Sequence, residues 1–313
     1  MLRTLVSLLL LASPALFGQA QSGTIVGTIT DPAGAVISAA KVTLVNEGTN
    51  FTRSVSTNES GQFVAYSVPT GAYSITVEQS GFQKLVRSGI QLTAADTLRI
   101  DLQLTVGSVQ ETIEVTESTP LLQSQTAVVS SLVTNQQMVE MPLNGRTFTA
   151  LLKLSPGATT GSSGNLTTSP YAMRGDVNIS VNGSSAQNNS YLIDGMVNRN
   201  LWLSTLVMVP TIDSIQEVRM LTSNYSAEYG AAAGAITIVQ TKSGSNQLRG
   251  SLYEFLRNDK LDARNWLAPS RALTRQNEFG VTVGGPVFLP KLYNGKNRTF
   301  FFADYAGLRE VRG

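Results

Sequence analysis

The chain has 313 residues, carries a formal net charge of +2 at pH 7, and contains neither histidine nor cysteine. The lack of histidine excludes Ser-His-Asp and Cys-His catalytic arrangements and zinc sites built on histidine, and the lack of cysteine excludes a disulfide framework. A carboxylate dyad or a lysine nucleophile stays open, but only 14% of the residues are charged and no two carboxylates have a spacing that suggests acid–base catalysis. We therefore predict a protein that is not an enzyme, with no catalytic residue, metal site or cofactor.

Residues 1–20 have the three-part layout of a secretory signal peptide. Arg3 supplies a positive charge, residues 5–11 form a mostly apolar run, and small residues stand at Gly18 and Ala20. The run is too short for a spanning helix, and a buried core helix is the alternative. We expect cleavage after Ala20 and an exported protein, in which any membrane insertion is by β-strands.

Residues 21–106 contain short strands separated by turns. Apolar residues alternate with polar ones in two places, as expected for strands with one buried face, and turns follow about every 8 to 12 residues. The alternating residues are Tyr73, Ile75, Val77, Leu98, Ile100, Leu102 and Leu104. The pattern is typical of an all-β sandwich, and about 80 residues are enough to bury one modest core.

Two motifs stand out in this region, GTIVGTITDPAG at its start and NESGQFVAYSVPTGAYSITV in its middle. With the strands between them they resemble a carboxypeptidase regulatory-like domain, a prealbumin-like sandwich that is also classed as a carbohydrate-binding-like fold. The resemblance implies no peptidase here, because a zinc peptidase needs histidine ligands. The aromatic residues Phe63, Tyr66 and Tyr73 either line a sugar site or, as we favour, pack in the core.

Residues 107–133 are polar and are predicted to be a linker. Polar and apolar residues alternate in one short segment of it, which consists of Glu111, Thr112, Ile113, Glu114 and Val115. Such a segment can add as a strand to an exposed sheet edge, its backbone giving affinity and its side chains giving register. The alternative is a linker that continues the last strand of the sandwich.

Residues 134–245 mix short helices and strands. We predict helices over residues 134–142 and 146–157, two strands that flank the segment NGSSAQNN, a short helix that leads into a strand in IDSIQEVRMLTS, and a strand in AITIVQT. Arg146 either meets an anionic ligand or, as we favour, lies at a solvated helix start. The last part of the chain differs, because residues 246–313 carry 11 basic and 6 acidic side chains and 10 of the 22 aromatic residues. We do not predict nucleic-acid binding, since the basic residues are dispersed.

Asp194 and Gly195 follow the strand-forming run YLI. The carboxylate raises three alternatives, which are a catalytic group, a metal ligand and a turn residue. Asp-Gly is a preferred hairpin pair because both residues tolerate positive φ. We therefore predict a hairpin turn at this point.

Four ordered motifs connect these segments, namely ISVNGSSAQNNSYLIDGMVN, IDSIQEVRM, the small-residue loop EYGAAAG and AITIVQTKSG. Together they resemble the plug domain of TonB-dependent outer-membrane transporters. The resemblance implies structural roles, and in the loop small residues allow backbones to approach closely. The residues that match the plug pattern are Asp194, Gly195, Glu217, Tyr229, Gly230, Gly234, Lys242 and Gly244.

Three aromatic-rich segments end the chain, GSLYEFLRNDKLDARNW, NEFGVTVGGPVFLPK and NRTFFFADYAGLRE. They resemble the first barrel strands of the Oar-like branch of this family. A plugged transporter barrel has about 22 strands of roughly ten residues, and residues 246–313 have room for at most about three. We therefore expect a fragment or a truncated product. Because three strands cannot close a barrel, we also expect this part to be poorly packed or irregular.

Members of this family carry a TonB box, a short D/E-T-hydrophobic-x-V segment before the plug, and ETIEV at residues 111–115 stands in the corresponding place. The resemblance implies pairing of this segment with the periplasmic domain of TonB. It also implies outer-membrane lipid around a complete barrel. The transported solute stays open among oligosaccharides, siderophores and peptides.

The predicted fold class is mainly β with an α+β plug. The predicted parts are a signal peptide (1–20), a prealbumin-like β-sandwich (21–106), a linker with the box (107–133), the plug (134–245) and the first strands of an incomplete transmembrane β-barrel (246–313). The predicted function is energy-coupled uptake of a solute across the cell outer membrane, with the sandwich in the periplasm and the plug closing the barrel lumen. The alternative is a secreted or surface carbohydrate-binding module without transport activity.

Overall fold

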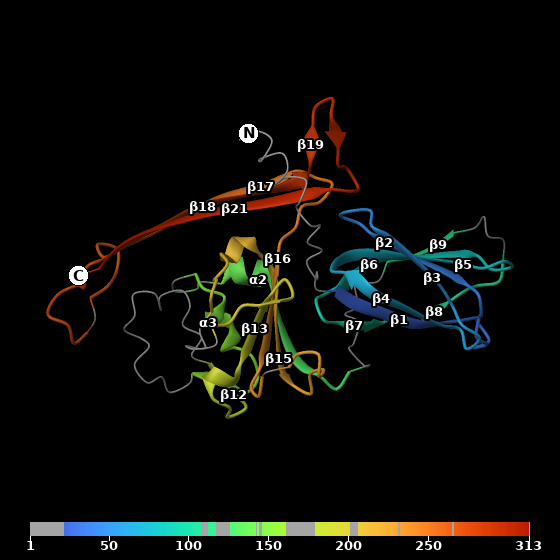
Figure 1. Cartoon of the computed structure of the whole chain (residues 1–313), viewed down its shortest axis with the longest axis horizontal. Helices are drawn as coiled ribbons and strands as arrows, with labels where there is room; N and C mark the ends of the chain where they lie inside the picture. Colours follow the sequence, from blue (N-terminus) through green and yellow to red (C-terminus); the bar gives the residue numbers. More distant parts are fainter. Residues whose placement is uncertain are drawn as a thin grey trace, which may run out of the picture.

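The computed structural model shows three parts (Figure 1). An N-terminal sandwich lies beside a central domain, and a long sheet formed by the last strands crosses the central domain. The predicted signal peptide, its cleavage position and Glu111 lie outside the described residues. No helix in the described part of the chain has the length and apolar character needed to cross a membrane. The described residues are 22–107, 112–116, 126–141, 143, 146–160, 179–200, 206–230, 232–264 and 266–312.

The sandwich consists of two sheets. Its strands are β1 (Ser22–Thr30), β2 (Lys41–Asn46), β3 (Thr52–Ser56), β4 (Gln62–Pro69), β5 (Gly71–Glu78), β6 (Lys84–Leu92), β7 (Thr97–Arg99), β8 (Leu102–Gln103) and β9 (Thr112–Thr116). In the first sheet, β1 pairs antiparallel with β4 and parallel with β7 and β8. The second sheet has the order β3-β2-β5-β6-β9.

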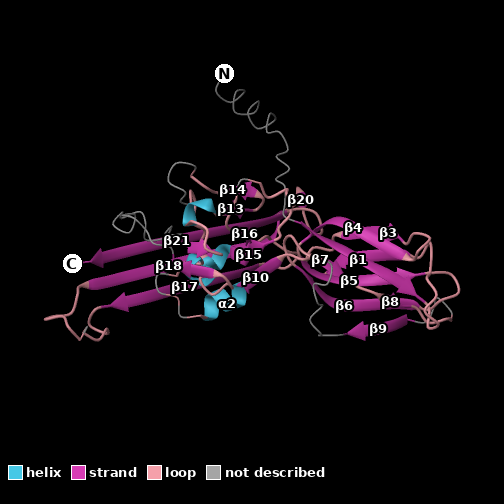
Figure 2. Cartoon of the chain, turned by 90° about the horizontal axis from the view of Figure 1, so that it is seen from below, coloured by secondary structure: helices cyan, strands magenta, loops and turns pink. Residues whose placement is uncertain are grey.

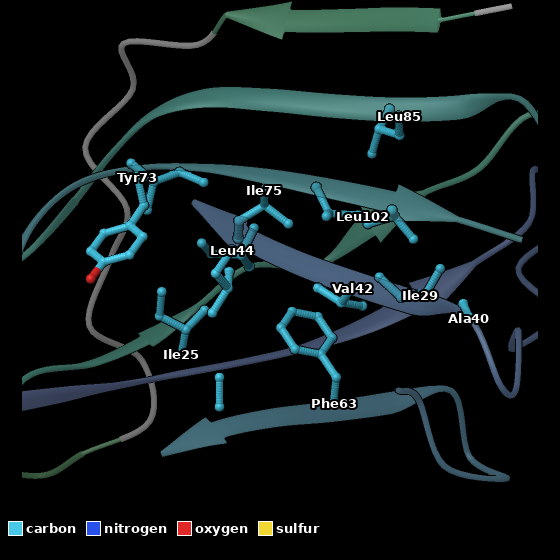
Figure 3. Close-up of a cluster of buried hydrophobic side chains, with 14 of the residues drawn as sticks. Ile25, Ile29, Ala40, Val42, Leu44, Phe63, Tyr73, Ile75, Leu85 and Leu102 are labelled. Carbon is cyan, nitrogen blue, oxygen red and sulfur yellow. The ribbon is translucent and has the colours of Figure 1, made fainter. Parts of the chain in front are cut away.

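Alternating burial along these strands forms the core between the two sheets (Figure 3). Ile25 and Ile29 of β1 belong to one buried cluster with Leu44 and Ile75 of the opposite sheet. Each such side chain contributes about 1.5–3 kcal/mol by leaving water. The alternation predicted around Ile100 is confirmed, since its four apolar residues are buried although the segment is divided between β7 and β8.

Two of the three aromatic residues considered for a sugar site belong to this core. Phe63 and Tyr73 are 1% and 0% exposed, and the Tyr73 hydroxyl donates a hydrogen bond to the Pro69 carbonyl at 2.8 Å. Only Tyr66 reaches solvent, with 65% exposure. Core packing is therefore the correct interpretation for Phe63 and Tyr73.

The central domain is built on a mixed sheet of order β10-β15-β16-β13-β14. The strands of the domain are β10 (Val129–Thr134), β11 (Ala158–Thr160), β12 (Ile179–Val181), β13 (Ser190–Ile193), β14 (Met196–Val197), β15 (Ile215–Ser223) and β16 (Ile236–Thr241), of which β11 and β12 form a separate two-stranded sheet. Its helices are α2 (Asn135–Glu140), α3 (Thr149–Leu152) and the 3₁₀ turns η2 (Ala186–Asn188) and η3 (Ile212–Ser214). Strands β12 and β13 flank NGSSAQNN, and η3 leads into β15, as predicted. Both β9 and β10 lie in the stretch that the sequence assigned to a linker.

Of the two helices predicted in this domain, one is confirmed and the other is shorter than predicted. The first is confirmed as α2, which begins with a capping box in which Thr134 and Gln137 satisfy each other's backbone N–H groups. The second is much shorter than predicted, because α3 makes a single turn. After it the chain reverses through Gly157, whose φ is 79°, and the Ala158 N–H donates to the Ser155 carbonyl at 3.0 Å as β11 begins.

The last part of the chain forms an antiparallel sheet of order β17-β18-β21. The strands are β17 (Arg249–Asn258), β18 (Thr274–Pro286) and β21 (Phe300–Arg312), and a small hairpin joins β19 (Phe288–Leu289) to β20 (Tyr293–Asn294). The expectation of an irregular structure is wrong, since both ladders keep one register along their length. Backbone groups between neighbouring antiparallel strands pair without a closed barrel, while β17 and β21 are the edge strands of the described sheet.

The two faces of this long sheet differ in which side chains they bury and expose. On the face toward the central domain, Glu278 and Thr282 are each 5% exposed. On the other face, Leu252, Leu256 and Tyr305 are 86%, 65% and 64% exposed. Figure 2 shows the three strands side by side along the central domain. Buried polar side chains on the covered face and exposed apolar side chains on the open face are typical of barrel strands that meet lipid.

Candidate functional site

A hairpin turn joins β13 to β14 at Asp194 and Gly195, whose φ angles are 47° and 83°. The Asp194 carboxylate faces the end of β16. It accepts hydrogen bonds from the Thr241 N–H at 2.9 Å and from the Thr241 hydroxyl at 2.7 Å. The carboxylate is thus engaged in holding the hairpin to the neighbouring strand.

We expect Asp194→Ala to lower the free energy of unfolding by about 1–3 kcal/mol, because the half-buried Thr241 groups lose their acceptors. Asp194→Asn is the matched control, since asparagine keeps one acceptor oxygen and tolerates positive φ. Denaturant unfolding of the chain in detergent measures both. Equal stability of Asp194→Ala and the parent would contradict a structural role for the carboxylate.

The small-residue loop before β16 contains two glycines of the plug pattern. A Cβ at Gly234 would collide with the Asn189 side chain, which accepts from the Ala235 N–H at 2.8 Å. Close approach therefore accounts for Gly234. It does not account for Gly230, where a Cβ would meet nothing within 4 Å.

A group of charged residues joins the central domain to the long sheet, and we call it the junction cluster: Arg146, Asp213, Lys242, Glu278 and Asp304. Arg146 donates from Nη2 to Asp213 Oδ2 at 2.5 Å, and its Nε lies 3.7 Å from Glu278 Oε1. These three side chains are only 12%, 10% and 6% exposed. The guanidinium also lies 3.6 Å from the centre of the Phe255 ring. The interpretation of Arg146 as a solvated helix start is therefore wrong.

Lys242 and Gly244 lie at the same junction. Burial lowers the pKa of Lys242, while Asp213 and Asp304 oppose that shift. Asp304 of β21 accepts from the Thr211 hydroxyl at 2.9 Å. A Cβ at Gly244 would collide with backbone oxygens of the long sheet, so glycine lets the two backbones cross closely there.

A second buried contact joins the central domain to the sandwich, and we call it the Ala94 contact. It consists of Thr93, Ala94 and Asp96, in the loop between β6 and β7, and of Glu217 and Arg219 on β15. Glu217 Oε1 accepts from the Ala94 N–H at 2.6 Å, and Arg219 Nη1 donates to the Ala94 carbonyl at 2.8 Å. Arg219 Nη2 also lies 3.8 Å from Asp96 Oδ1. One acid and one base thus satisfy both polar groups of a single residue.

The Ala94 contact is buried. Glu217 is 5% and Arg219 3% exposed. Burial raises the pKa of Glu217, the Ala94 N–H and Arg219 oppose the shift, and Asp96 adds to it. Tyr229 is half-buried and packs against the apolar cluster that contains Ala94. Burial raises the pKa of the Tyr229 phenol. Sequence reasoning missed Arg219, although a strand with an acid and a base two residues apart was a usable signal.

The segment predicted as a TonB box lies at an edge of the sandwich. Residues 112–116 form β9, which pairs in parallel with residues 84–88 of β6. The segment is therefore a separate strand and not an extension of β8.

Within the described part of the chain, no group of three or more acidic residues is placed to hold a metal ion.

Comparison with known families matches all three parts. Residues 24–105 match the carboxypeptidase regulatory-like domain, residues 122–236 the TonB-dependent receptor plug domain, and residues 240–313 an outer membrane beta barrel domain. The chain is also 26% identical over 308 residues to the TonB-dependent transporter Oar of Myxococcus xanthus. The match covers 92% of this chain and 27% of that relative, so the chain spans about a quarter of its length.

Two solved receptors resemble the chain in part. The siderophore receptor PirA of Acinetobacter baumannii matches with a TM-score of 0.40 and 20% identity, over 60% of this chain and 25% of that chain. A mutant of the ferric enterobactin receptor of Pseudomonas aeruginosa matches with a TM-score of 0.38 and 17% identity, over 51% of this chain and 23% of that chain.

Proposed function

Because the chain belongs to the Oar-like TonB-dependent receptors, with a carboxypeptidase regulatory-like domain, a plug domain and part of an outer-membrane barrel, we propose that it acts in energy-coupled uptake of a solute. The family is one of transporters and not of enzymes. In this proposal the plug closes a barrel lumen in the outer membrane. TonB supplies the force that opens a path through it.

The observation that carries this proposal is the long sheet and its two faces. The covered face packs on the plug through Arg146 and Glu278, while Leu252 and Leu256 are exposed on the other face. Lipid is the environment that suits such an apolar face. The charged plug contacts suit the inside of a barrel.

The remaining parts of the proposal concern the localisation and the partners of the protein. We place the sandwich in the periplasm and assign export to a signal peptide that is cleaved after Ala20. The domain boundaries and the box at residues 111–115 are part of the same proposal. The solute is an oligosaccharide, a siderophore or a peptide. A separate carbohydrate-binding function is not favoured, because Phe63 and Tyr73 are core residues.

The box is tested by substitution at Ile113. Proline removes a backbone donor and fixes φ, so we expect Ile113→Pro to lose binding to the periplasmic domain of TonB. Ile113→Val is the matched control and should bind nearly as well as the parent, since strand addition depends mainly on the backbone. The measurement is binding of that domain to the full chain in detergent.

The sandwich should stay folded in both variants, because β9 is an edge strand. Thermal unfolding of the sandwich checks this point. If Ile113→Pro binds TonB as the parent does, residues 111–115 are not the TonB-binding segment.

A further inference from the structure

The candidate box is paired with a strand of the sandwich. Strand β9 is the outermost described strand of the five-stranded sheet, next to β6 (Figure 2). The pairing is parallel and in register over five residues, from Lys84 opposite Thr112 to Ser88 opposite Thr116. The backbone groups on one side of the segment are therefore already used inside the chain.

The pairing gives β6 a neighbour that it otherwise lacks. Among the described strands, β6 lies between β5 and β9. Without β9, residues 84–88 would form an open sheet edge, and such an edge is a template for pairing with any available strand. The sandwich therefore gains from holding the segment.

The ladder between β6 and β9 is nevertheless short. Only five residues pair, and each backbone hydrogen bond contributes about 0.5–1.5 kcal/mol net. A second protein that offers an edge of similar length can therefore compete for the strand. The exchange replaces one set of backbone hydrogen bonds by another of the same kind.

We propose that β6 and TonB compete for β9. While β9 is paired with β6, TonB does not bind the box, and TonB binds only after the strand has left the sheet. This inference rests on the proposed function, because it takes residues 111–115 to be the TonB-binding segment. Its consequence is regulatory. The apparent affinity of TonB is reduced by the fraction of chains in which the strand is held.

A disulfide trap tests the competition in the full chain. The sequence contains no cysteine, so Ser88→Cys together with Thr116→Cys gives one defined pair. The two positions are opposite each other in the ladder and outside the five box residues. Neighbouring strands lie about 4.8 Å apart, within the range that a disulfide spans.

We expect mild oxidation of the chain alone to join the two cysteines. With the periplasmic TonB domain present at about ten times its Kd, about one chain in eleven stays unbound, so disulfide formation should slow roughly tenfold. The matched control is Thr43→Cys with Ser54→Cys, a facing pair in β2 and β3 of the same sheet. Its oxidation should not respond to TonB.

Each outcome decides a different point. If the Ser88–Thr116 pair does not oxidise while the control pair does, the sandwich does not hold the strand and the inference is wrong. If TonB binds but the oxidation rate is unchanged, TonB pairs without removing β9, and only the inference fails. If TonB does not bind the reduced chain at all, the proposed function of the box fails with it.

Discussion

Replacing Arg146 with methionine is expected to lower the free energy of unfolding of the chain in detergent by about 3–5 kcal/mol, the range for removing one partner of a buried ion pair. Methionine leaves Asp213 without the guanidinium at 2.5 Å and Glu278 without the cation at 3.7 Å. It also removes the charge above the Phe255 ring. The loss should fall on the contact between the plug and the barrel strands.

Two substitutions control this result. Arg275 pairs with Asp259 at 3.3 Å, but 55% of its side chain is exposed, so Arg275→Met should cost only about 0–1 kcal/mol. Arg146→Lys keeps the charge but loses the planar fork and its stacking, and should fall in between. Denaturant unfolding and protease cleavage of the plug report the effect. A loss in Arg146→Met no larger than in Arg275→Met would show that the junction cluster does not hold the plug.

Sequence reasoning succeeded where a feature depends on residues that are close in the chain. The turn at Asp194 and Gly195 follows from the preference of that pair for positive φ. Helix α2 follows from its Thr134 cap, and the buried face around Ile100 follows from a period of two. Each of these signals is complete within about ten residues, so no knowledge of the tertiary contacts was needed.

It failed where the contact joins distant segments. Arg146 meets Asp213 across 67 positions, and the Ala94 N–H meets Glu217 across 123. Nothing near Arg146 in the sequence indicates that a strand will cover it, so a solvated position was the reasonable expectation. The placement of β9 beside β6 likewise depends on which edge of the folded sandwich lies open.

The Ala94 contact gives a second large effect. Arg219→Met removes the donor to the Ala94 carbonyl at 2.8 Å and the cation that opposes the raised pKa of Glu217. At neutral pH Glu217 then either stays ionised in a buried site, at 5% exposure, without the Arg219 charge, or binds a proton at a cost in stability. We expect the free energy of unfolding to fall by about 3–5 kcal/mol.

The loss in Arg219→Met should depend on pH with a definite sign. Burial raises the pKa of Glu217 above its ordinary value of 4.5, and loss of Arg219 raises this pKa further. The folded chain then keeps a proton that the unfolded chain has released. Stability is therefore fully present below the unfolded pKa and is lost as pH rises through the folded pKa. The difference between Arg219→Met and the parent should shrink as pH falls toward 4.5.

The double variant Arg219→Met/Glu217→Gln isolates the carboxylate. Glutamine still accepts a hydrogen bond from the Ala94 N–H but carries no charge. At neutral pH the double variant should be more stable than Arg219→Met, and this difference should vanish in acid, where Glu217 is protonated anyway. The rescue is partial, because Asp96 also loses the guanidinium at 3.8 Å. Unfolding curves at several pH values measure both differences, and a double variant no more stable than Arg219→Met at neutral pH would show that Glu217 does not carry the buried charge.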